Sequence, residues 1–304
     1  MAAALTSASF LPTVDFVAQT NTTDIIQSSP GVVRPARRPP GWHAPGPAPS
    51  ADLDRIGVSP QRGEDLCFLV GDWRILQLVS GHRWSLDDLV TAELAAQGEV
   101  PTRALDLGCG IGSVLMMVAW SFPSVVSVGV EAQEVSAALA RRSLRYNGCT
   151  ERVRVLAGDF RSVAIDGGPF ELITGTPPYF ETGTHTVSNG LQRGPCRHEL
   201  RGGVSDYLAT ARANLSEGGR VVVCFAHRQG PSVHDALAAN GLYASRWRSV
   251  VPKTGREPLL DVIEARVGPP REFQTERLVV RDAEGQWTPE FARVRERMGL
   301  PPRL

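Results

Sequence analysis

The chain has 304 residues, which is long enough for one large domain or two smaller ones. Basic and acidic residues both total 32, so a net charge of zero excludes binding to nucleic acid through overall charge. Such binding would need a local surface of arginines, because Lys253 is the only lysine. No run of the sequence approaches the roughly 18 apolar residues of a membrane span.

Five cysteines are scattered along the chain without Cys-x-x-Cys spacing. Their odd number and mostly apolar surroundings favour free thiols in a reducing compartment and no structural zinc. We therefore expect a cytoplasmic protein, with an organelle or the nucleus as alternatives. The cysteines are Cys67, Cys109, Cys149, Cys196 and Cys224.

Residues 1–60 are expected to form a disordered extension rich in Pro, Ala and Arg. The stretch from Gly31 to Ser50 has this composition and no sustained hydrophobic period. The sequence before Arg34 contains no Lys or Arg but includes Asp15 and Asp24. This pattern is unlike secretory and mitochondrial targeting peptides, and an atypical organellar signal is the alternative.

Order is expected to begin near Cys67. Cys67–Val70 begins one strand, and Asp72–Val79 alternates enough to be a second, hairpin-like strand. Ser85–Ala96 opens with an N-capping serine and has Asp87 and Asp88 in its first turn, which predicts a helix. After the extension the expected regions are residues 61–100 (hairpin and helix), 101–268 (main domain) and 269–304 (C-terminal extension with a short helix).

Strands and helices alternate from Arg103 onward. Repeated β-α-β units with crossover helices imply an α/β fold with a Rossmann-like, doubly wound and mostly parallel sheet. The last two strands flank Pro252–Gly255, a loop so short that they form a hairpin and one strand is antiparallel. The expected strands are 103–107, 125–130, 152–156, 170–174, 220–225, 247–251 and 259–266, and the expected helices are 113–120, 134–146, 206–215 and 233–239.

A glycine-rich turn, Asp106-Leu-Gly-Cys-Gly-Ile-Gly112, joins the first of these strands to its helix. Gly108, Gly110 and Gly112 let the backbone pass close under a ligand and expose amide groups at the helix start. Dinucleotide enzymes use a related turn, but Asp106 would repel a pyrophosphate and suits the ammonium of a methionine moiety. A tight turn without a ligand is the alternative interpretation.

Acidic residues also end the next two strands. Glu131 lies where it can accept hydrogen bonds from both ribose hydroxyls of a nucleoside. Asp159 can accept from an adenine amine, with Phe160 against the ring. Each acid alone is more often a solvated strand end, but three at successive carboxyl ends of parallel strands predict one binding site. The expected cofactor is S-adenosylmethionine.

The segment Thr176-Pro-Pro-Tyr-Phe180, called the ledge below, ends the fourth strand beside that site. Pro177 and Pro178 fix their own backbone angles and restrict the preceding residue. Thr176 offers a hydroxyl to a planar amine, and Tyr179 and Phe180 can stack on its ring. Methyl transfer to an amine mainly requires alignment, so Thr176 to Tyr179 are the predicted catalytic residues. A turn that only ends a strand is the alternative.

The stretch after the ledge is rich first in Gly, Thr, Ser and Asn and then in arginine. It could close over a substrate, with Arg193 and Arg197 contacting RNA phosphates. Plain surface arginines are equally consistent with the sequence. His198 and Glu199 are neighbours in sequence and face different directions, which favours a structural role over a catalytic pair.

These residues resemble class I S-adenosylmethionine-dependent methyltransferases of the small methyltransferase domain type, specifically the bacterial valine-tRNA adenine-N6 methyltransferase family. The resemblance implies a seven-stranded sheet, with residues 101–268 as the methyltransferase domain, and methylation of an adenine amine in structured RNA. The ledge departs from that family, because it begins with Thr176 where the family has Asn. The similarity runs from about Gly63 to Met298 and includes Gly81–Leu89, Asp106–Gly110, Thr176–Phe180, Arg197–Leu200 and Arg277–Pro289.

The leading hypothesis is therefore methylation of the exocyclic N6 amine of adenine in tRNA or another structured RNA. N5-methylation of a protein glutamine, or methylation of another amine, is a second hypothesis, because a side-chain amide is also planar. A catalytically weak cofactor-binding partner of another methyltransferase is a third, motivated by Thr176 and the long extension. RNA is the expected partner, no metal or membrane is expected, and the sequence does not predict an oligomeric state.

Overall fold

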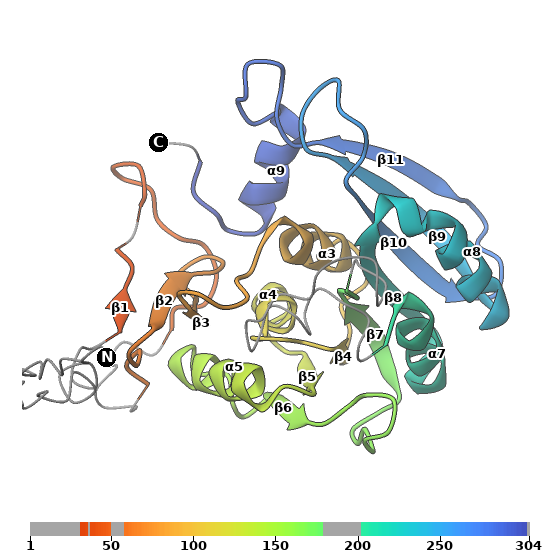
Figure 1. The fold of residues 1–304 in the computed structure, drawn as a ribbon, viewed down its shortest axis with the longest axis horizontal. Helices are drawn as coiled ribbons and strands as arrows, with labels where there is room; N and C mark the ends of the chain where they lie inside the picture. Colours follow the sequence, from red (N-terminus) through yellow and green to blue (C-terminus); the bar gives the residue numbers. More distant parts are fainter. Residues whose placement is uncertain (1–30, 36, 50–57, 179–201, 303–304) are drawn as a thin grey trace, which may run out of the picture.

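The computed structural model describes residues 31–35, 37–49, 58–178 and 202–302. Its centre is an eight-stranded sheet with the order β11-β9-β10-β8-β7-β4-β5-β6 (Figure 1). The strands are β4 (Arg103–Leu107), β5 (Val126–Glu131), β6 (Val153–Ala157), β7 (Phe170–Gly175), β8 (Leu215–Ala226), β9 (Leu242–Val251), β10 (Leu260–Val267) and β11 (Gln274–Val279).

Neighbouring strands from β6 to β8 are parallel, and β10 is antiparallel to both β8 and β9. The predicted doubly wound, mostly parallel α/β sheet with a C-terminal hairpin is confirmed. The predicted number of seven strands is wrong, because β11 adds an eighth, parallel to β9. The sequence does not reveal this strand because β11 is polar. Its Glu276 finds partners when the protein folds, where it accepts hydrogen bonds from Arg246 (2.5 Å) and Arg248 (2.7 Å).

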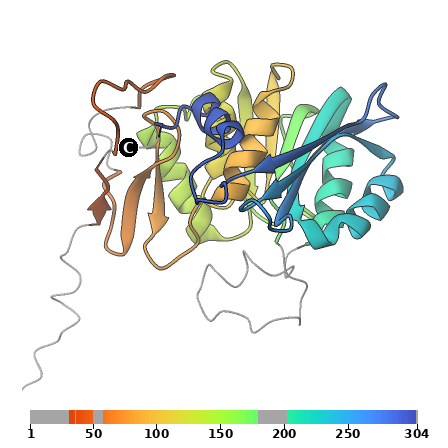
Figure 2. The same ribbon diagram turned by 90° about the horizontal axis from the view of Figure 1, so that it is seen from above.

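Helices cover both faces of the sheet because successive strand residues point to opposite sides. On β8, Val222 and Cys224 belong to the core shared with α3, α4 and α5, while Val221 and Val223 pack with α7 and α8. Figure 2 shows α9 beside α3 on the first of these faces. The helices are α3 (Leu86–Ala96), α4 (Ser113–Ser121), α5 (Glu134–Tyr146), α7 (Val204–Asn214), α8 (Gly230–Ala239) and α9 (Pro289–Arg297).

A small sheet lies beside α5. β2 (Glu64–Phe68) and β3 (Arg74–Leu78) form the expected antiparallel hairpin. The hairpin is tied to α5 because the backbone amide of Leu76 donates to the Ser143 hydroxyl at 2.9 Å. The side chain of Asn147, just after the helix, bonds both the amide and the carbonyl of Arg74.

Residues 31–35 and 37–49 differ from the disorder expected for them, because they contact the folded domain. Val32–Val33 forms β1, which pairs in parallel with β2. Arg34 donates at 2.9 Å to Asp65, a fully buried carboxylate that also accepts from Arg83 at 3.1 Å. A buried carboxylate requires such partners, so the charge of Asp65 holds this segment in place. Sequence periodicity cannot detect an anchor of this kind.

None of the helices within the described ranges is long and apolar enough to cross a membrane. Within the same ranges, no group of three or more His, Cys, Asp or Glu side chains could hold a metal ion.

Candidate active site

The carboxyl ends of β4, β5, β6 and β7 bring the predicted cofactor residues to one edge of the sheet. Gly108, Gly110 and Gly112 follow β4 with φ angles of 59°, 56° and 85°, a region that L side chains rarely adopt. Gly108 is also closely approached, since a Cβ there would lie 2.1 Å from the hydroxyl oxygen of Tyr207. The turn leads directly into α4, so its amides gather at a helix start.

Asp106 sits on β4 with 3% of its surface exposed. One carboxylate oxygen, Oδ1, accepts a hydrogen bond of 2.8 Å from the Thr174 hydroxyl on β7. The other, Oδ2, is buried and has no hydrogen-bond partner in the part of the chain that the structure describes. Burial raises the pKa of Asp106 to about 7, and the charge of Glu131 contributes in the same direction. The site therefore holds an unsatisfied acceptor that a cation would complement.

Glu131 ends β5 and closes over the glycine turn. Its Oε2 accepts from the amide of Gly110 at 2.8 Å, and its Oε1 accepts from the amide of Gln133 at 2.6 Å. A carboxylate offers about four acceptor positions, so these bonds orient Glu131 without using all of its capacity. The third predicted acid, Asp159, follows β6 and accepts from the Arg161 guanidinium at 2.9 and 2.6 Å.

Phe160 is buried and makes an edge-on contact with Tyr207, with ring centroids 4.6 Å apart. Tyr207 lies on α7 and was missed by the sequence analysis, although its helix was predicted. A Cβ at Gly175 would meet the Tyr207 ring at 2.6 Å, and one at Gly108 would meet its hydroxyl. The ring therefore fills the space between the glycine turn after β4 and the end of β7, a tertiary arrangement that the sequence does not signal.

The ledge begins next to the glycine turn. Gly175 ends β7 in register with Leu107, the residue after Asp106. Thr176 follows at once and is partly exposed, Pro177 is buried, and Pro178 is partly exposed. The predicted site residues Tyr179, Phe180, Arg193 and Arg197 lie outside the described residues.

Asp88 is a second residue that the sequence analysis did not assign to the site. It was expected only as an acid in the first turn of a helix. In the structure its Oδ1 accepts from the Ser113 hydroxyl, at the first residue of α4, at 2.7 Å. The contact crosses from one helix to another, so no local pattern could have shown it.

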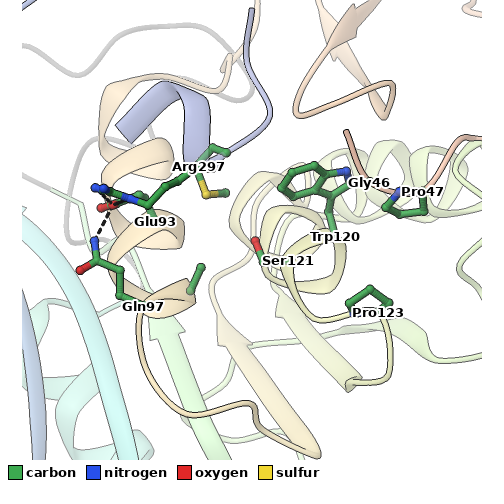
Figure 3. A pocket seen from close by; sticks show the side chains of 10 residues that line it. Gly46, Pro47, Glu93, Gln97, Trp120, Ser121, Pro123 and Arg297 are labelled. Carbon is green, nitrogen blue, oxygen red and sulfur yellow. Dashed lines mark hydrogen bonds and ion pairs between the residues drawn. The ribbon is translucent and has the colours of Figure 1, made fainter. Parts of the chain in front are cut away.

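A cavity of about 450 Å³ lies elsewhere, between the distal ends of α3 and α4 (Figure 3). Trp120 and Ser121 line one side, near Gly46 and Pro47, and Glu93, Gln97 and Arg297 line the other. α4 starts at the glycine turn, so its last residues are at the opposite edge of the sheet from the predicted site. This cavity is separate from the cluster around Asp106.

The donor set fits S-adenosylmethionine. The buried oxygen of Asp106 that has no partner among the described residues suits a cationic ammonium, and the left-handed glycines expose amides without side chains in the way. Glu131, held by two backbone amides, provides acceptors for hydroxyl groups. Fold and residues together are those of a class I methyltransferase.

Comparisons with known proteins agree with this class. Residues 104–189 match the family described as "Methyltransferase domain". The chain is 26% identical over 252 residues to a tRNA1(Val) (adenine(37)-N6)-methyltransferase of Porphyromonas gingivalis, covering 81% of this chain and 91% of that protein. It is 28% identical over 244 residues to a release factor glutamine methyltransferase of Rhodospirillum rubrum, covering 70% of this chain and 74% of that protein.

Among solved structures, the fold is similar to that of a predicted O-methyltransferase from Agrobacterium tumefaciens. The TM-score is 0.54 at 22% identity, covering 72% of this chain and 99% of that chain. The protein is a class I S-adenosylmethionine-dependent methyltransferase, an enzyme that transfers methyl groups.

Proposed function

We propose that the enzyme methylates the exocyclic N6 amine of adenine in tRNA or another structured RNA. The observation that carries this proposal is the position of the ledge. Gly175, the residue before the ledge, pairs with Leu107, the residue after Asp106, so the ledge starts beside Asp106. The similarity to the Porphyromonas gingivalis tRNA methyltransferase supports it, because that match spans most of both chains.

In this proposal the cofactor is held by the residues at the ends of β4, β5 and β6. Asp106 receives the ammonium of its methionine part, and the amides after Gly108, Gly110 and Gly112 lie under it. Glu131 accepts from the ribose hydroxyls. Asp159 accepts from the adenine amine, which requires it to share its carboxylate with Arg161. Phe160 supports this end of the site through its contact with Tyr207.

The bound cofactor supplies an electrophilic methyl group on its sulfonium. The chain contributes alignment, because attack by an amine needs its lone pair directed at the methyl carbon. We assign this to Thr176, whose hydroxyl accepts from the target amine, and to the rigid Pro177 and Pro178. Tyr179 and Phe180 stack on the base, and Arg193 and Arg197 contact RNA phosphates. The methylated nitrogen then loses its extra proton to water.

Methylation of a protein glutamine is the second candidate. The observation that favours it is the similarity to the Rhodospirillum rubrum release factor glutamine methyltransferase. A glutamine amide is planar, like an adenine amine, and would fit the same ledge. The adenine proposal is preferred because the match to the tRNA enzyme covers more of both proteins.

The two candidates are separated by supplying the purified enzyme with methyl-labelled cofactor and separate pools of total RNA and total protein. Label in RNA that digests to N6-methyladenosine supports the adenine proposal. Label confined to protein would overturn it in favour of the glutamine candidate. The Asp106→Asn variant, which loses the proposed ammonium partner, serves as the negative control.

We place the reaction in the cytoplasm, because the described cysteines are free thiols, as is usual in reducing compartments.

A further inference from the structure

The carboxyl end of β8 lies one strand away from the ledge. β8 runs parallel to β7, and its Val223 pairs with Gly175, the residue before the ledge (Figure 1). β8 continues beyond this pair to Ala226, which at about 3.3 Å per residue carries it roughly 10 Å further along the strand direction. His227 follows Ala226 directly. His227 therefore stands at the same edge of the sheet as the ledge.

A buried carboxylate fixes the ring of His227. Asp261 on β10 is 1% exposed, and each of its oxygens lies 3.0 Å from Nδ1 of the imidazole. Because an ionised carboxylate only accepts hydrogen bonds, Nδ1 carries the hydrogen in this pair. The His227 side chain nevertheless stays 46% exposed. The imidazole is thus held in one orientation with much of its surface open to solvent.

The loop between β9 and β10, residues 252–259, lies beside His227. The amide of His227 donates to the carbonyl of Leu259 at 3.1 Å, and the amide of Leu259 donates to the carbonyl of Val250 at 2.9 Å. Leu259 is apolar and still 55% exposed. A fixed, exposed ring next to an exposed leucine offers a surface on which a planar group can pack.

The same loop carries two cations that are free to bind an anion. Lys253 and Arg256 are exposed, and neither side chain forms an ion pair with any residue in the described part of the chain. Glu257 is the only acid in the loop. The loop backbone is held in place, because the amide of Thr254 donates to the carbonyl of Arg281 at 2.8 Å and the amide of Arg256 donates to that of Lys253 at 3.0 Å.

We propose that these groups form an RNA-binding rim, made of His227, Leu259, Lys253 and Arg256, which holds the RNA strand next to the methylated adenosine. An unpaired base stacks on His227 and Leu259, and phosphates contact Lys253 and Arg256. The inference rests on the RNA substrate proposed above, because an adenosine at the ledge brings its neighbouring nucleotides to this edge. The chain has a net charge of zero, so local cations must supply the attraction for RNA.

The charges of the rim are tested by the binding of fluorescently labelled total tRNA to the full-length protein over a series of salt concentrations, without cofactor. Replacing both Lys253 and Arg256 by Gln is expected to weaken binding about tenfold at low salt. The slope of log affinity against log salt should fall by about 1.4 to 1.8, because two phosphate contacts are lost.

The matched control combines Arg212→Gln with Arg271→Gln. Both arginines are exposed and lie at the opposite edge of the sheet, since Arg212 is in the last turn of α7 before β8 and Arg271 lies between the end of β10 and the start of β11. This variant removes the same charge away from the rim. It is expected to keep the salt slope and to bind within about twofold of the wild type, because distant charges are screened.

The ring is tested separately. Removing it alone would leave the buried charge of Asp261 without its partner, so both test variants also carry Asp261→Asn. With His227→Ala, tRNA binding is expected to be about tenfold weaker at an unchanged salt slope, because stacking is lost. With His227→Phe, a flat ring returns, and the affinity should recover to within about threefold of the wild type.

These binding measurements involve no methyl transfer, so they separate the rim from the proposed reaction. Absence of tRNA binding by the wild type, wild-type affinity in the Lys253 and Arg256 double variant, or equal affinity of the Ala and Phe variants would overturn the rim. The expected losses, together with no N6-methyladenosine in the product, would support the rim and overturn the proposed reaction. Competition by polyglutamate as strong as by unlabelled tRNA would assign the surface to an acidic protein segment and overturn the RNA proposal.

Discussion

The hydroxyl of Thr174 on β7 donates a 2.8 Å hydrogen bond to the buried carboxylate of Asp106 on β4. This bond connects the strand that ends in the ledge with the strand that ends in the glycine turn. It fixes one oxygen of Asp106 and leaves the other buried without a partner among the described residues. This hydrogen bond therefore links the strand that leads to the proposed substrate site with the strand that leads to the proposed cofactor site.

Replacing Thr174 by valine tests this bond. The variant keeps the shape of the side chain but leaves Oδ1 of Asp106 without its donor, so we expect a loss of about 1–3 kcal/mol in the free energy of unfolding. Cofactor affinity should fall as well, because the carboxyl becomes harder to ionise. Denaturant unfolding and calorimetry measure the two effects. Thr174→Ser keeps the hydroxyl and should stay close to the wild type; a Thr174→Val protein as stable as wild type would contradict the prediction.

The buried carboxyl of Asp106 should make stability depend on pH. Its pKa is raised from 3.8 to about 7 in the folded protein, so the native state holds the proton more tightly than the unfolded state. This contribution is fully present below about pH 4 and is lost as the pH rises through 7. The stability of the wild type relative to Asp106→Asn should therefore decrease between pH 5 and pH 8.

Asp166 provides a control of opposite sign. Its hydrogen bond from Arg154 lowers its pKa, so the wild type should gain stability over Asp166→Asn as the pH rises through about 4. Unfolding curves of both variants across the pH range give the comparison. A constant difference between wild type and Asp106→Asn from pH 5 to 8 would show that Asp106 is not perturbed by burial.

Gly108→Ala should weaken cofactor binding. The added Cβ would meet the Tyr207 hydroxyl oxygen at 2.1 Å in a left-handed conformation, so the turn or the tyrosine must move. We expect a cost of about 1–3 kcal/mol in stability and at least tenfold weaker binding. Gly218→Ala is the control, because Gly218 also has a positive φ but has open space around its Cβ position. That variant should cost about 1 kcal/mol and bind normally; equal binding by both variants would contradict a role for the turn.

Thr176→Ala tests the ledge. If the hydroxyl accepts from the target amine, its removal should lower kcat by about tenfold while cofactor affinity stays unchanged. Thr176→Ser should retain most of the activity because it keeps the hydroxyl. Steady-state kinetics with tRNA and calorimetry with the cofactor separate the two effects. A Thr176→Ala enzyme with wild-type kcat would remove Thr176 from the proposed mechanism.

Periodic patterns predicted most of the fold. The glycine turn and the strand ends at Glu131 and Asp159 could be placed because parallel strands put their carboxyl ends at one edge. β11 was missed because an edge strand needs few apolar residues, and its Glu276 is satisfied by arginines of β9, which are distant in the sequence. The contacts of residues 31–35 and 37–49 were missed because they depend on partners distant in the sequence, such as the buried carboxylate of Asp65, which accepts from Arg34, and Asp72, which accepts from Arg38.

The site was predicted less completely than the fold. Asp106 could be placed at the end of its strand because the glycine turn follows it directly in the sequence. Tyr207 and Asp88 could not, because each reaches the glycine turn from a different helix. Which residue a side chain on a helix reaches depends on how that helix packs against the sheet, and this packing forms only when the sheet is assembled.

The reaction proposed for this enzyme is methylation of adenine N6 in RNA. The most direct measurement is mass spectrometry of nucleosides from the tRNA and rRNA fractions of cells with and without the gene. We expect N6-methyladenosine to disappear from one RNA fraction in the knockout and to return when the wild-type chain, but not Asp106→Asn, is restored. Unchanged N6-methyladenosine in every tRNA and rRNA fraction would contradict it.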